Sequence, residues 1–112
     1  MASADKIAKW ESQVRKGSLD FIVMVLLEKE QLYGYDLILR LEKSAGLQVS
    51  EGTIYPLLSR MAKEELVESE WVTMKTGMPR KYYRLTSTGK KTLKQMKTAW
   101  KQFSLSIEKL LA

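Results

Sequence analysis

The 112-residue sequence contains no cysteine and no histidine. The missing cysteines exclude disulfide bonds, thiolate metal ligands and cysteine nucleophiles. Without histidine as well, a zinc site would have to be built from carboxylates alone. The two absences also remove the commonest general base and the softest nucleophile of enzymes, and the sequence has no phosphate-binding or dinucleotide-binding glycine motif. We therefore expect no catalytic activity, no metal and no cofactor.

Long apolar runs are missing too, because none approaches the roughly 20 residues that a membrane-spanning helix needs. The first residues are charged through Asp5 and Lys6, which is not the pattern of a secretory signal. Since 45% of the residues are hydrophobic, the chain can form a core. A domain of this size is only modestly stable alone. We therefore expect one cytoplasmic domain, without a membrane partner, that gains stability by pairing with a second copy.

Acidic residues are absent between Trp71 and Ile107. Residues 1–70 carry 9 basic and 12 acidic residues, a net charge of −3, whereas residues 71–112 carry 10 and 1, a net charge of +9. The two halves sum to the +6 of the whole chain. Such an asymmetry indicates a polyanionic partner. The alternative is a lysine-rich helix face that is simply solvated.

Hydrophobic periodicity predicts a helical arm and two core helices in the first 46 residues. The arm covers residues 1–17, and three apolar residues recur along it at helical spacing: Ile7, Trp10 and Val14. The run FIVMVLL that follows is apolar nearly all round, so its helix should be buried on more than one side. Residues 28–32 should form a loop before the second helix, on which Tyr35 should face inwards and which Gly46 should end as a left-handed cap.

A third helix should start after Ser50, which is a favourable N-cap residue. Pro56 lies just past its first turn and lacks an N–H group, so a tightened first turn or a mild kink is expected. Two helices joined by a short link make a helix-turn-helix candidate. The outward face of the third helix holds the residues that we expect to touch DNA: Ser50, Thr53, Tyr55, Pro56, Ser59, Arg60 and Lys63.

Two features of this face leave alternatives open. Tyr55 could instead be a partly buried aromatic that seals the helix-turn-helix, which is nearly as good an interpretation as DNA contact. Arg60 could reach guanine edges or phosphates, as could Lys63, and the sequence does not decide which.

Two strand-like runs follow the third helix, over residues 67–74 and 81–85, with turn residues between them. They predict a β-hairpin, or wing, with basic residues at and near its tip. A basic hairpin beside a groove-binding helix can hold the flanking phosphates or enter the minor groove. The candidate wing contacts are Lys75, Thr76, Arg80 and Lys81.

The last predicted helix starts after Thr86 and runs to about Leu111. Its apolar residues are spaced 3, 4, 3, 4, 3 along the chain: Leu93, Met96, Trp100, Phe103, Ile107 and Leu110. This spacing is that of a heptad seam. We expect the seam to form a homodimer with help from the arm, since two-fold dimers are the commonest oligomers. The alternative is packing within one protomer.

Trp100 lies in the middle of this seam, with Met96 and Phe103 one turn on either side. In a two-fold dimer Trp100 could lie near its own copy and leave a slot in which an aromatic ligand stacks. Plain interface packing is the simpler interpretation. No acidic residue lies within one turn of Trp100 in the sequence, so a preference for cations is not indicated.

Three motifs together resemble the PadR family of winged-helix transcriptional regulators: YGYDL at 33–37, GTIYPLL at 52–58 and PRKYYRLT at 79–86. The resemblance implies a dimer that usually represses transcription, with the GTIYPLL helix on DNA and the wing beside it. The single C-terminal helix is similar to that of a compact subgroup, some of whose members bind flat aromatic or cationic compounds at the dimer centre. That role would fall on Trp100, Met96 and Phe103. The wing reads TGMPR where family members often carry a further arginine.

The sequence thus predicts a mainly α fold with a small β-hairpin wing. A winged helix-turn-helix over residues 18–86 would lie between the arm at 1–17 and a dimerisation helix at 87–112. The predicted function is a homodimeric repressor of a pseudo-palindromic DNA operator, which a small aromatic effector could release. The alternative is a non-catalytic protein-interaction or architectural module built on the same fold.

Overall fold

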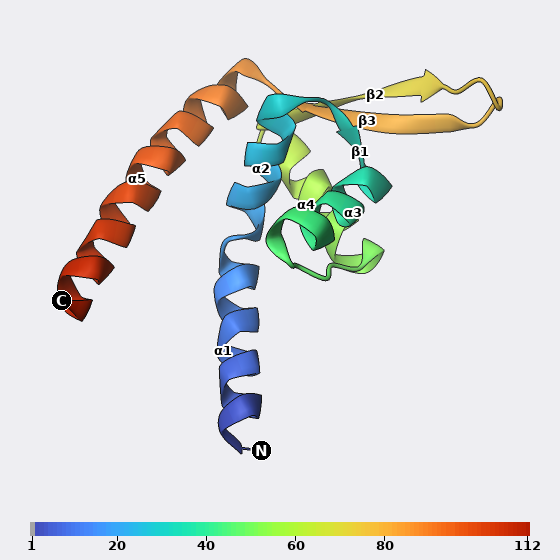
Figure 1. Cartoon of the computed structure of the whole chain (residues 1–112). Helices are drawn as coiled ribbons and strands as arrows, with labels where there is room; N and C mark the ends of the chain where they lie inside the picture. The colour runs from blue at the N-terminus through green and yellow to red at the C-terminus, as the bar shows by residue number, and fades with distance from the viewer. Residues whose placement is uncertain (1) are drawn as a thin grey trace.

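The computed structural model describes residues 2–112, and within them five helices pack at one end of a small sheet whose hairpin projects outwards (Figure 1). The elements are α1 (Ala2–Gly17), α2 (Leu19–Lys29), β1 (Leu32–Tyr33), α3 (Gly34–Ala45), α4 (Glu51–Lys63), β2 (Val67–Thr73), β3 (Pro79–Leu85) and α5 (Ser87–Leu111). The predicted class, mainly α with an antiparallel wing, is confirmed. Across the described residues, no helix is long and apolar enough to cross a membrane.

The hydrophobic core lies where α2, α3 and α4 meet the sheet and the first half of α5. Each element contributes at least one buried side chain: Val23, Leu41, Leu58, Tyr83 and Leu93 are examples. Full burial of an aliphatic side chain of this size contributes roughly 1.5–3 kcal/mol. The core therefore fixes α4 against α3, with the outward face of α4 left free.

The ends of α3 and α4 form as the residue types predict. Gly46 adopts a left-handed conformation with φ of 64°. Its N–H donates to the Glu42 carbonyl at 3.1 Å, and the N–H of Leu47 donates to the Leu41 carbonyl at 3.1 Å. At the start of α4, the carbonyl of Ser50 accepts the N–H of Thr53 at 3.1 Å as well as that of Ile54 at 3.0 Å. The first turn is thus tightened, as the nearby Pro56 leads one to expect.

The sheet has three antiparallel strands in the order β1-β3-β2, which corrects the expected loop at 28–32. The helix α2 continues to Lys29, and Leu32 belongs to a strand that pairs with Tyr83. Leu32 is buried, so it joins the core while its backbone extends the sheet. A strand of two residues has too few positions to show an alternating pattern, which is why the sequence did not indicate it.

Two predicted orientations were wrong. Tyr35 does not face inwards but is 50% exposed, because Leu37 and Leu41 occupy the buried side of α3. Leu93 does not reach the dimer seam but is completely buried in the core of its own protomer. Leu93 is therefore not available to the proposed dimer seam, which would begin one turn or more later on α5.

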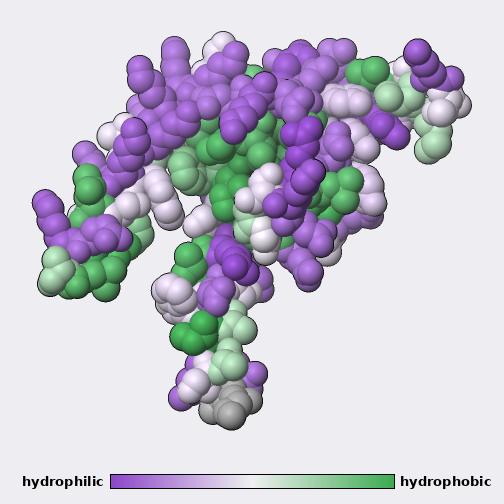
Figure 2. Space-filling model, in the orientation of Figure 1, coloured by the Kyte–Doolittle hydropathy of each residue, from purple (hydrophilic) through white to green (hydrophobic). Residues whose placement is uncertain are grey.

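Three parts of the molecule project from the core: α1, the second half of α5 and the hairpin of β2 and β3 (Figure 1). The radius of gyration is 16.2 Å, compared with about 13 Å for a compact domain of 100 residues. Figure 2 shows hydrophobic surface at the free end of α5 and along α1, while the outer side of α5 is hydrophilic. Apolar surface exposed in this way is typical of an interaction surface.

Candidate nucleic-acid interface

The helix α4 presents one buried and one exposed face. Ile54, Leu58 and Met61 are buried against the core, as their spacing predicts. All seven residues proposed for DNA contact are exposed: Ser50, Thr53, Tyr55, Pro56, Ser59, Arg60 and Lys63. The helix therefore offers a mostly polar exposed face, on which Tyr55 and Pro56 are the exceptions.

Tyr55 combines the two interpretations that the sequence left open. Its ring packs so closely over Gly34 that a Cβ atom there would lie 2.5 Å from the Tyr55 Cε1 atom. At the same time Tyr55 is 42% exposed. One side of the ring thus seals α3 against α4, and the remainder is free to touch a ligand. Burial, and secondarily the nearby Tyr55, raises the pKa of the Tyr83 phenol.

Arg60 is partly engaged within the protomer. Its Nη2 atom lies 3.8 Å from Asp20 Oδ2 and its Nε atom 3.5 Å from Glu64 Oε1. Both pairs are exposed, so each contributes little stability. A DNA phosphate would compete with these carboxylates for Arg60. Lys63, by contrast, has no carboxylate within 4 Å in the part of the chain that the structure describes.

Aromatic rings support the wing cations on both faces of the sheet. The Arg80 guanidinium lies 4.6 Å above the ring of Tyr33, and the Lys81 ammonium lies 5.8 Å from the rings of Trp71 and Tyr83. Such contacts restrain a cation and leave N–H groups free to donate. Tyr33 and Trp71 were not predicted to support these cations. Trp71 could have been found by pairing the strands about the turn, because it lies directly opposite Lys81.

The acidic residues of the wing are neutralised at its base. Arg84, which was not among the predicted contacts, pairs through Nε with Glu68 at 2.9 Å and through Nη1 with Glu70 at 3.2 Å. Hydrogen bonds to Glu68 and then Glu70 raise the pKa of the Arg84 guanidinium. The outer part of the wing consequently keeps its positive charge. Its tip holds Lys75 and Thr76, both exposed.

A cleft lies on each side of α4. The first, of about 460 Å³, separates α4 from the wing and is lined by Tyr55, Trp71, Arg80 and Lys81, among others. The second, of about 600 Å³, separates the first turn of α4 from the end of α1. The exposed face of α4 is thus bordered by grooves with cationic walls.

The three residues proposed for an effector pocket do lie together. Met96, Trp100 and Phe103 line a hollow of about 300 Å³, with Trp100 packed against the ring of Phe21 at 5.7 Å. Asp20 lines the same hollow, so an acid adjoins the site although none is near Trp100 in the sequence. Sequence spacing could not indicate Phe21 or Asp20, because both come from the start of α2.

The remaining candidates for a dimer interface are exposed on α1 and on the outer half of α5. They are Ile7, Trp10, Val14, Phe103, Ile107 and Leu110. Within residues 2–112, no group of three or more acidic side chains is arranged to hold a metal ion.

The helix pair α3 and α4, the antiparallel wing and the cationic clefts define a winged helix-turn-helix transcriptional regulator. Residues 23–95 match the model of the transcriptional regulator PadR-like family. The chain belongs to this family, which regulates transcription through DNA binding and is not an enzyme class.

Solved structures of similar proteins agree with this assignment. A PadR-like transcription factor of Bacteroides fragilis is 42% identical, with 91% of this chain and 98% of that chain covered and a TM-score of 0.75. A PadR family transcriptional regulator of Eggerthella lenta is 33% identical, with 99% and 96% covered and a TM-score of 0.89. A further relative is similar in sequence: an uncharacterized protein of Lysinibacillus sphaericus is 32% identical over 91 residues, which are 80% of this chain and 84% of that protein.

Proposed function

We propose that this regulator is a homodimeric repressor that binds a pseudo-palindromic operator in cytoplasmic, nucleoid DNA. The observation that carries the proposal is the exposed polar face of α4 beside a wing whose Arg80 and Lys81 are held by aromatic rings. A helix with this exposure fits the major groove, and the wing would hold the flanking backbone. The two half-sites would lie one helical turn apart, roughly 34 Å.

The exposed apolar surfaces of α1 and α5 support a dimer. Trp10 is 62% exposed, Phe103 60% and Leu110 85%. Side chains of this size rarely stay in water together on projecting helices. A second copy related by two-fold symmetry would cover these residues and would place two α4 helices on one side of the dimer.

A small effector would bind in the hollow beside Trp100. The rings of Trp100 and Phe21 offer stacking surfaces. Asp20 in the lining offers a negative charge that its exposed pair with Arg60 at 3.8 Å compensates only weakly. These features favour a flat aromatic compound that carries a positive charge. Because the hollow lies between α2 and α5, a ligand there could change the separation of the two α4 helices and so release the operator.

The test is a selection of random duplex DNA on the purified protein at near-physiological salt. A two-fold symmetric motif, bound with an affinity that falls steeply as salt rises, is the expected result. Retention without a motif would contradict the operator and favour an architectural role. Tight binding that ignores salt, or a monomer at micromolar concentration, would also contradict the proposal.

Substitution of the wing cations gives a sharper test. Arg80→Ala combined with Lys81→Ala should weaken binding to all duplexes about equally and lower the salt slope by about 1 for each phosphate that is no longer neutralised. Fluorescence anisotropy at several salt concentrations measures both quantities. The matched control is Lys90→Ala with Lys91→Ala, which removes the same charge from the exposed start of α5. Equal effects in the two double variants would argue against a role of the wing in DNA binding.

A further inference from the structure

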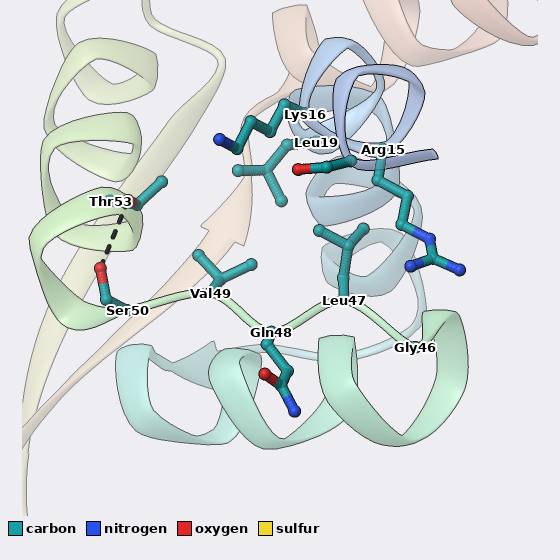
Figure 3. A pocket seen from close by; sticks show the side chains of 10 residues that line it. Arg15, Lys16, Leu19, Gly46, Leu47, Gln48, Val49, Ser50 and Thr53 are labelled. Carbon is teal, nitrogen blue, oxygen red and sulfur yellow. Dashed lines mark hydrogen bonds between the residues drawn. The ribbon is translucent and has the colours of Figure 1, made fainter. Parts of the chain in front are cut away.

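The second cleft beside α4 is here called the α1 cleft. It lies between the end of α1 and the link that connects α3 to α4 (Figure 3). Its floor is apolar through Leu19 and Leu47, both buried. Its walls are polar: Ser12, Arg15 and Lys16 from α1, and Gln48, Ser50 and Thr53 from the link and the first turn of α4. In Figure 3 the Lys16 side chain extends towards α4, while that of Arg15 lies on the other side of Leu47.

The charge of the α1 cleft is positive and weakly compensated. No acidic side chain lines it. Arg15 pairs with Glu11 of the same helix at 3.3 Å, an exposed pair that water and salt weaken. Within the described residues Lys16 has no carboxylate within 4 Å, and Glu51, the nearest acid in the α4 sequence, starts the helix outside the lining. The cleft therefore attracts an anion.

The geometry of a major groove indicates which anion. The groove is about 12 Å wide and an α-helix with its side chains is about 10–12 Å across, so a bound helix has a sugar-phosphate strand on each side. On α4, Tyr55 borders the wing cleft with Arg80 and Lys81, whereas Ser50 and Thr53 border the α1 cleft. Cations thus stand on both sides of the helix, at the positions where two strands would pass.

We propose that Arg15 and Lys16 form a second phosphate clamp, which holds the operator strand opposite the one held by the wing. This inference rests on the proposed operator binding and adds α1 to the DNA interface. A recognition helix usually contacts bases through its N-terminal residues. The clamp lies beside that end of α4, so it would fix how deeply the first turn enters the groove.

The first test compares two double variants of the same helix with the duplex obtained by selection. Arg15→Gln with Lys16→Gln should weaken binding about tenfold at near-physiological salt and lower the salt slope by about 1 for each phosphate that is no longer neutralised. Lys6→Gln with Lys9→Gln removes the same charge from exposed residues outside the cleft, so its effect should be clearly smaller. Equal effects would overturn the clamp.

A second measurement locates the contact without relying on affinity. Because the chain has no cysteine, Lys16→Cys introduces a unique thiol that can crosslink to a thiol tethered at chosen backbone positions of the duplex. Crosslinks should concentrate on one strand at each half-site, opposite those formed by Lys81→Cys. A Lys16→Cys variant that crosslinks no better than Lys9→Cys would refute the clamp.

The two proposals fail in distinguishable ways. If the wild-type chain selects no motif, the operator itself is refuted and the clamp falls with it. If it selects a motif and the wing variants weaken binding while the Arg15 and Lys16 variants match their controls, the clamp alone is wrong. Circular dichroism and sedimentation of the variants separate both results from misfolding or dissociation of the dimer.

Discussion

At the scale of single residues, glycine controls how closely neighbouring segments of the chain approach. Gly89 lies in the first turn of α5, where an added Cβ atom would collide with the carbonyl of Leu66. That carbonyl already accepts the N–H of Thr86 at 3.1 Å, so it cannot easily move. Gly34 likewise allows a close approach, in this case of the Tyr55 ring. The atoms nearest to an added Cβ there belong to the far end of the Tyr55 side chain and not to the backbone.

We expect Gly89→Ala to destabilise the protein by roughly 1–3 kcal/mol, because overpacking against backbone must shift α5. Urea unfolding followed by circular dichroism measures the change. Gly17→Ala is the control, since nothing lies within 4 Å of its added methyl group. Alanine is the better helix former by about 1 kcal/mol, so that variant should be neutral or slightly more stable. Similar losses of stability in both variants would show that the Leu66 contact is unimportant.

Residue chemistry accounts for much of what could be predicted at this scale. Gly46 as a left-handed cap, Ser50 as the start of α4 and Thr86 as the start of α5 were all predicted from residue type and position, and all three are confirmed. Cap preferences are local, because they depend on a few consecutive backbone groups. The contact of Gly89 with Leu66 could not be predicted, because hydrophobic periodicity describes one helix or strand at a time and this contact joins two different segments.

At the scale of elements, the two N-caps behave differently. Thr86 accepts the Gly89 N–H at 2.9 Å and donates its hydroxyl to the Glu65 carbonyl, so it ties α5 to the end of α4. Ser50 makes no side-chain cap bond to α4. Its hydroxyl lies 3.4 Å from the Thr53 hydroxyl and remains exposed.

Thr86→Ala should therefore cost about 1 kcal/mol of unfolding free energy, whereas Ser50→Ala should cost less. The order should reverse for operator affinity, because Ser50 lies on the proposed DNA face and Thr86 does not. Thermal unfolding and DNA titration of the two variants, with Thr86→Ser as the conservative control, give both comparisons. A larger stability loss for Ser50→Ala would contradict this division of roles.

Helices were predicted better than strands and orientations. The apolar side of α4 was assigned correctly because Ile54, Leu58 and Met61 repeat with the helical period. The strand β1 escaped notice because Leu32 and Tyr33 extend the sheet by pairing with β3, a segment about 50 positions away. Tyr35 was assigned to the wrong side because two leucines of α3 compete for the same buried positions.

At the scale of the whole molecule, the heptad seam of α5 divides between two tasks. Leu93 is buried in the protomer and Met96 packs against that core, whereas Phe103 and Leu110 are exposed. One continuous pattern thus serves both the fold and the proposed dimer. Periodicity cannot separate the two tasks, because both need an apolar side chain on the same stripe.

Substitutions on the two parts should have separable effects. Leu93→Ala should cost about 2–5 kcal/mol of stability by leaving a cavity, with little change in self-association of the folded chain. Phe103→Glu should leave the protomer folded and shift the dimer towards monomer in sedimentation velocity at several concentrations. Gln102→Glu, which adds the same charge to an exposed neighbouring position, should leave the dimer intact. A dimer unaffected by Phe103→Glu would place the interface elsewhere.

The class of this protein follows from its amino-acid order alone. Local rules were enough for it: helix period, caps, turn residues, the lack of acidic residues from Trp71 to Ile107 and three short motifs. The side chains that meet across the fold became apparent only once the chain was folded. Packing brings Asp20 and Phe21 to Trp100, Tyr33 to Arg80, and Lys16 towards the first turn of α4. These residues become neighbours because segments that are distant in the sequence pack together. The pattern of residues within one segment does not show which other segment it will pack against.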